Sequence, residues 1–150
     1  MDIFDLLIPK IKAISDILLL EDRHETYIFP ADLTDEVAFT APAAGAWNWS
    51  RIKDTSGNFL DDLFAAADGR ITVIVIEKTD DNSEYYEIEL GYGDERTHIT
   101  SMRVYGGNVP KQSERLKSGV IPAGSEIFYR CKTTAALGSI LRGHFRYHIV

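Results

Sequence analysis

His144 and His148 stand four residues apart in the stretch HFRYH, residues 144–148. On an α-helix this spacing is typical of a zinc-binding pair. Apolar and polar residues alternate here, however, which predicts a β-strand, and four residues of a strand span about 13 Å. The two imidazoles then share a face but cannot share one metal ion, and His24 and His98 add no further grouping. We therefore predict no metal site.

Other residues with catalytic chemistry are also isolated in the sequence. Cys131 is the single cysteine and alternates with apolar residues, so we expect a small buried side chain that forms no intrachain disulfide. No serine elbow and no phosphate-binding glycine loop is present. The acidic pairs Asp61-Asp62 and Asp80-Asp81 are typical of a solvated helix face and a turn. These patterns favour a protein that is not an enzyme and needs no cofactor.

The charge is distributed unevenly along the chain. Residues 1–100 contain 21 acidic residues against 8 lysines and arginines, whereas residues 101–150 contain 2 against 8. On two expected strands, alternation places the basic side chains opposite the apolar ones. They are Arg130 and Lys132 on the first strand, and Arg142, His144, Arg146 and His148 on the second. If these strands are hairpin neighbours, the six residues form one cationic stripe.

The sequence allows two kinds of partner for this stripe. It can pair with an acidic strand bearing Glu87 and Glu89, within one subunit or across an interface. It can also bind an anionic ligand such as a sulfated or carboxylated glycan. Nucleic acid is disfavoured, because the net charge of −7 repels a long polyanion.

Trp47 and Trp49 are the only tryptophans and follow a Pro-Ala-Ala-Gly turn. Residues two apart on a strand share a face, so the two indoles act together. Their neighbours Ala46, Asn48 and Ser50 are small or polar, as on an exposed face. We therefore expect both tryptophans to point inward, into the core or a seam between subunits. A platform for stacking sugars is the alternative.

The elements that must position these residues are short strands. With 150 residues and 45% hydrophobic composition, the chain has the size and balance of one soluble domain. From about residue 36 onward, apolar and polar residues alternate between turn signals, and GNFLDDLFAAADG (residues 57–69) predicts one short inserted helix with Asn58 as its cap. The predicted fold is mainly β: an antiparallel β-sandwich or jelly roll with an N-terminal amphipathic helix.

Residues 1–25 form a separate segment before the β-domain of residues 26–150. Its apolar residues follow a heptad spacing, at Phe4, Leu7, Ile11, Ile14 and Leu18. Interior charges and the missing cleavage site argue against a signal peptide, and the segment is too interrupted to span a membrane. We expect it to wind with copies of itself, to dock on another protein, or to pack on its own domain.

Two turns carry a resemblance to a known group of proteins. The stretches FTAPAAGAW and VIPAGSEIFYR resemble the β-sandwich modules of bacteriophage structural proteins, in which Pro-Ala-x-Gly turns join strands. Similar turns appear in trimeric heads of the tumour-necrosis-factor and complement type. The resemblance covers residues 36–150 and implies a non-enzymatic, homotrimeric virion component: a capsid decoration, a head fibre or a tail-fibre tip.

The expected function follows from this resemblance. The chain is predicted to be a virion structural protein that is made in the host cytoplasm, forms a homotrimer and docks on capsid or tail subunits. The alternative is a carbohydrate-binding or receptor-binding module.

Overall fold

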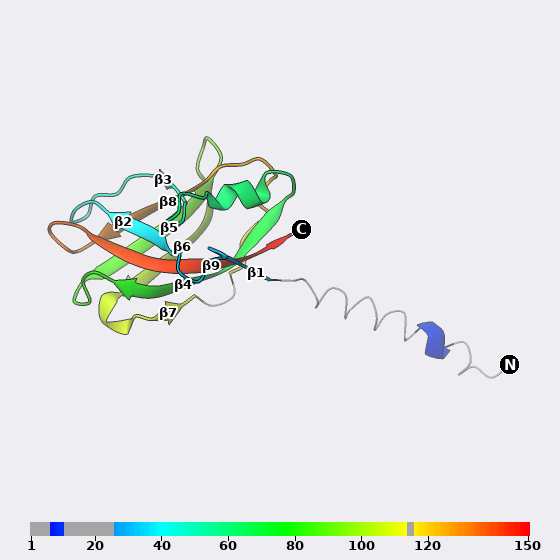
Figure 1. Ribbon diagram of the computed structural model, residues 1–150, viewed down its shortest axis with the longest axis horizontal. Helices are drawn as coiled ribbons and strands as arrows, with labels where there is room; N and C mark the ends of the chain where they lie inside the picture. The colour runs from blue at the N-terminus through cyan, green and yellow to red at the C-terminus, as the bar shows by residue number, and fades with distance from the viewer. Residues whose placement is uncertain (1–6, 11–25, 114–115) are drawn as a thin grey trace.

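The computed structural model describes residues 7–10, 26–113 and 116–150, and the body of the chain consists of strands joined by turns and loops (Figure 1). The elements are, in chain order, β1 (Tyr27–Phe29), β2 (Val37–Ala41), β3 (Ser50–Arg51), the 3₁₀ helix η1 (Leu60–Phe64), β4 (Gly69–Thr79), β5 (Tyr85–Tyr92), β6 (Thr97–Tyr105), the 3₁₀ helix η2 (Gly106–Asn108), β7 (Lys111–Gln112), β8 (Ile127–Thr133) and β9 (Ser139–Ile149). The prediction of a mainly β chain is confirmed.

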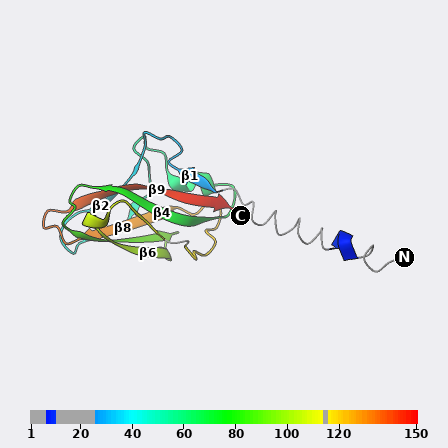
Figure 2. The same ribbon diagram turned by 90° about the horizontal axis from the view of Figure 1, so that it is seen from below.

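The strands form two antiparallel sheets, which appear as two layers in Figure 2. The β9 sheet has the order β1-β9-β4-β7, and β2 pairs with β9 beyond the end of β1. The β8 sheet has the order β3-β8-β5-β6. From β2 onward, every connection crosses from one sheet to the other except the β5–β6 hairpin. Neighbours within a sheet are therefore mostly distant in sequence.

Alternation along each strand builds the core between the sheets. In β5, Tyr86, Ile88 and Leu90 are buried, whereas Tyr85 is exposed and Glu87 lies on the outer face, as the sequence predicts. Residues of both sheets join one cluster whose largest fully buried members are Phe39, Phe64, Phe145, Ile52, Leu60, Ile71, Ile74, Ile76, Ile88, Leu90, Ile121 and Ile127.

Both Pro-Ala turns of the sequence form turns in the structure. The Ala46 N–H donates to the Ala43 carbonyl at 3.2 Å, and the Ser125 N–H donates to the Pro122 carbonyl at 3.2 Å. Gly45 and Gly124 adopt φ values of 71° and 78°, which favour glycine because a Cβ would strain the backbone there.

Three local predictions need correction. The inserted helix is the 3₁₀ helix η1, whose N-cap position is Phe59, with no side-chain capping hydrogen bond; the Asn58 side-chain amide donates to Asp54 at 3.1 Å. Strands also begin earlier than residue 36, at β1, and the short strand β7 lies in a polar stretch without apolar alternation. β1 and β7 have three and two residues, too few for alternation to identify them.

The N-terminal heptad prediction falls mostly outside the described residues. Phe4, Ile11, Ile14 and Leu18 all lie there. Leu7 belongs to a helical turn formed by residues 7–10, and 44% of its surface is exposed. The docking role of this segment therefore stays a prediction.

Candidate functional site

The six predicted basic residues do not form one stripe. Arg130 and Lys132 belong to β8, whereas Arg142, His144, Arg146 and His148 belong to β9 in the other sheet. The hairpin expectation is wrong because the connection between β8 and β9 crosses between the sheets. The two basic strands consequently face opposite sides of the molecule.

One side is an aromatic–ionic face on the outside of the β8 sheet. Its members are Trp47, Trp49, Glu87, Glu89, Arg103, Arg130 and Lys132. Arg130 Nη2 lies 2.7 Å from Glu89, and Lys132 Nζ and Arg103 Nε each lie 3.1 Å from Glu87. For Arg130 and Lys132, pairing with the acidic strand inside one chain is thus confirmed.

Glu87 shows how completely these charges compensate each other. The hydrogen bond from Lys132, followed by the one from Arg103, lowers the pKa of the Glu87 carboxyl below its ordinary value. Glu87 therefore stays ionised at neutral pH between two cations. A face that neutralises itself in this way attracts an anionic partner only weakly.

Trp47 and Trp49 lie on this outer face and not in the core. Both are half-buried, and neither joins the core cluster. The guanidinium carbon of Arg130 lies 3.8 Å from the Trp47 ring centroid and 4.6 Å from that of Trp49. Lys132 Nζ lies 4.4 Å from the Trp47 ring. The prediction that they lie in the core is wrong, because the fully buried residue of this segment is Ile52, on the opposite parity. A seam between subunits at these tryptophans stays a prediction.

A glycine provides the space for Trp49. Gly91 of β5 is buried, and a Cβ placed on it would approach Trp49 Cη2 to 3.2 Å and the Arg96 carbonyl oxygen to 3.0 Å. The tryptophan can therefore lie against the sheet surface over bare backbone. This explains why the edge segment before β3 covers the face.

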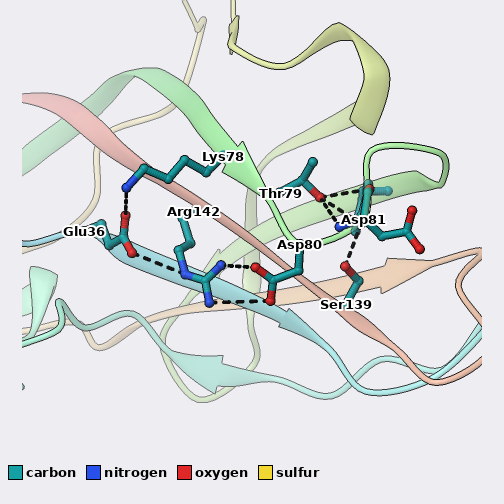
Figure 3. Close-up of polar contacts among 8 residues, drawn as sticks. Glu36, Lys78, Thr79, Asp80, Asp81, Ser139 and Arg142 are labelled. Atoms are coloured by element: carbon teal, nitrogen blue, oxygen red, sulfur yellow. Dashed lines mark hydrogen bonds and ion pairs between the residues drawn. The ribbon is translucent and has the colours of Figure 1, made fainter.

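On the other side of the molecule, Arg142 is the centre of an ionic network (Figure 3). Its Nε lies 3.2 Å from Glu36, and its Nη1 and Nη2 contact the carboxylate of Asp80. Lys78 also reaches Glu36, at 3.4 Å. Hydrogen bonding to Asp80 raises the pKa of Arg142. This arginine joins the start of β2 to the end of β4 and acts structurally.

Next to this network, the outer face of the β9 sheet carries an apolar–basic patch, which we define as Ile28, Arg70, Val73, Val75 and Arg146. Ile28 and Val73 flank Arg146 in the strand register. Ile28 is 46% exposed, and both valines are half-buried. Within the described part of the chain, neither Arg70 nor Arg146 has a carboxylate within ion-pair distance. This side therefore presents aliphatic surface and uncompensated positive charge together.

The remaining candidates have ordinary surroundings. Nδ1 of His144 lies 2.8 Å from Glu77, and His148 faces Arg70 across the β4–β9 ladder. Among the described residues, no group of His, Cys, Asp or Glu could hold a metal ion. Cys131 is fully buried, and burial raises the pKa of its thiol to about 12. It is therefore not a reactive thiolate at neutral pH.

One ion pair escaped the sequence interpretation. Arg51 Nε and Nη2 donate to the buried Asp61 carboxylate at 2.8 and 2.5 Å, and Asp61 also accepts from the Ile127 N–H at 3.0 Å. Asp61 was expected on a solvated helix face. A buried acid needs such donors, but Arg51 lies ten residues away and Ile127 lies 66 residues away, so no helical or strand spacing indicated the pair.

No protein-family model matches the chain, and no curated protein sequence matches it significantly. Over the described residues, no helix has the length and apolar character needed to cross a membrane.

Proposed function

We propose that the two sheets form a β-sandwich of the jelly-roll type. A jelly roll contains eight antiparallel strands in two sheets joined by Greek-key connections. Strands β2 to β9 give that number, in the orders β2-β9-β4-β7 and β3-β8-β5-β6, with β1 as an additional edge strand. The crossing of nearly every connection between the sheets supports this topology.

The chain is, in this proposal, a non-enzymatic structural protein that assembles with copies of itself. The apolar–basic patch carries the proposal, because exposed aliphatic side chains among unpaired arginines are typical of a surface that is buried in an assembly. β1, which contributes Ile28, directly follows the predicted docking segment of residues 1–25. The two proposed contact elements are thus adjacent in the chain. A closed homotrimer is the expected form.

A virion is the proposed location of the assembly, after synthesis in the host cytoplasm. The resemblance of the two Pro-Ala turns to bacteriophage structural modules supports this part. In that setting the partners are capsid or tail subunits, and the role is a capsid decoration, head-fibre or tail component.

Sedimentation of the full chain tests the assembly. We expect a particle of three times 16.8 kDa at micromolar concentration. A monomer under these conditions contradicts the self-association. The virion location is tested by mass spectrometry, which should find the chain in purified particles of the phage whose genome encodes it. Absence of the chain from intact particles contradicts the virion location.

The alternative of a glycan-binding module gains support from the tryptophans. Half-exposed indoles beside arginine and glutamate side chains offer both ring stacking and hydrogen bonds to sugar hydroxyls. Because Glu87 and Glu89 neutralise the cations, a neutral glycan suits this face better than a sulfated one. A shift of tryptophan emission on adding such a glycan favours this alternative.

A further inference from the structure

A cleft of about 600 Å³ lies beside the edge strands β2 and β3 and the loop that follows β3. Its lining comprises Glu36, Ala38, Thr40, Ser50, Arg51, Lys53, Asp54, Thr55, Phe59, Tyr129 and Arg142. Volumes of this size are typical of small-molecule sites. The apolar–basic patch lies elsewhere, so this inference does not depend on the assembly proposal.

Tyr129 gives the cleft its most informative polar group. The side chain packs edge-on against Phe39, with ring centroids 5.2 Å apart, and only 7% of the residue is exposed. Its hydroxyl oxygen accepts a hydrogen bond from the Thr40 N–H at 3.1 Å. Among the described residues, no acceptor lies within hydrogen-bonding distance of its own proton. A buried O–H with a free proton favours a ligand oxygen as its partner.

Further donors line the same cleft. The Thr40 and Ser50 hydroxyls have no hydrogen-bond partner within the described chain, and neither does the ammonium group of Lys53. All three side chains are exposed and line the cleft. The open end of the cleft is therefore rich in hydroxyl and ammonium donors.

The other charged groups of the cleft are already held in place. Asp61 binds Arg51, whose guanidinium carbon also lies 3.9 Å from the Phe59 ring centroid. Glu36 accepts a hydrogen bond from Lys78, and Asp54 accepts one from the Asn58 N–H. The cleft therefore combines fixed donors and acceptors with the apolar side chains of Ala38 and Phe59, which matches a ligand that carries several hydroxyls.

We propose that this cleft binds one sugar unit. Tyr129 donates to a ring or hydroxyl oxygen at the base of the cleft, Ser50 and Lys53 contact hydroxyls at its mouth, and Glu36 or Asp54 accepts from a hydroxyl on the opposite edge. A sugar fits because it presents donors, acceptors and apolar C–H faces within one small molecule.

Amide NMR titration of the ¹⁵N-labelled full chain tests the proposal, with glucose, galactose, mannose and N-acetylglucosamine as probes. At least one of them should shift the amide signals of Thr40 and Ser50 saturably. If none shifts them at tens of millimolar, or if the shifts follow glycerol equally well, the proposal is wrong.

Two variants locate the binding. Ser50→Ala should weaken it several-fold, whereas Ser101→Ala, on the outer face of β6, should leave it unchanged. Tyr129→Phe should abolish it and also move the Thr40 amide signal in the free protein. Unchanged affinity in Ser50→Ala and Tyr129→Phe would overturn the assignment, and the Ser50 variant remains informative if the Tyr129 variant does not fold.

Discussion

The two outer faces of this molecule differ in how their charges are balanced. On the aromatic–ionic face, Glu87 and Glu89 each contact arginine or lysine, and indoles cover the cations. On the opposite side, Arg142 binds two carboxylates, whereas Arg70 and Arg146 of the apolar–basic patch contact no carboxylate of the described residues and lie beside aliphatic side chains. A sheet face whose charges are paired with one another is stable in contact with water. The patch, by contrast, gains stability when another surface covers it.

The largest expected effect comes from placing a charge within the patch. Ile28→Asp and Val75→Asp, each made alone, should weaken self-association about a hundredfold or more, because a carboxylate would be buried at the contact. Sedimentation should show monomers with an unchanged circular dichroism spectrum. Ser101→Asp on the aromatic–ionic face is the control and should stay assembled. If both faces respond equally, the contrast between them is wrong.

The two β9 arginines should separate stability from assembly. Arg142→Ala removes a partly buried network and should lower the free energy of unfolding by about 1–2 kcal/mol in urea. Arg146→Ala should change that free energy by less than about 0.5 kcal/mol, because the side chain is exposed and has no ion pair with any described residue. It should instead weaken assembly. Equal losses of stability would show that Arg146 has a structural role.

Removing an indole should affect the aromatic–ionic face alone. Trp49→Ala should lower the free energy of unfolding by about 1 kcal/mol, since its contact with Arg130 and its cover over Gly91 are lost. The mass in sedimentation should not change. A variant that is fully stable but no longer assembles would place the subunit seam at the tryptophans, as the sequence first suggested.

The smallest expected effect is on the free energy of unfolding at acidic pH. Because the folded pKa of Glu87 is lowered from 4.5, its stabilisation is complete above that ordinary value and disappears as the pH falls through the lowered folded value. Glu87→Gln should therefore flatten the decline of stability between about pH 6 and pH 3 by a few tenths of a kcal/mol, since the pair is partly exposed. In this variant, the remaining dependence of stability on pH should come in part from Asp32 and Asp81. Hydrogen bonds from Thr34 and Ser83, respectively, lower the pKa values of these two carboxyls. An identical pH profile for the variant would show that these ion pairs contribute nothing.

Local sequence was sufficient to predict most of the longer strands and which of their side chains face inward. Alternation in β5 predicts which of its side chains face inward, and the expectation that Cys131 is buried is confirmed. Alternation failed for Trp47 and Trp49, because parity shows that two residues share a face but not which face is buried. The small or polar neighbours Ala46, Asn48 and Ser50 indicated that the opposite face, with the tryptophans, is buried in the core. In an edge segment, however, such neighbours can be in solvent while the large rings cover the outer face of the sheet.

The sequence by itself determined the strand pattern and the two glycine turns. It also indicated, as one of two alternatives, that the basic strands pair with an acidic strand. Only the tertiary structure decided which strands are neighbours: it separated β8 from β9, joined Arg51 to Asp61 and opened the cleft beside Tyr129. The physical reason is that side-chain alternation is a property of one strand, set by its own backbone geometry. Strand partners depend on how long connections cross between sheets, and many crossings satisfy the same local pattern.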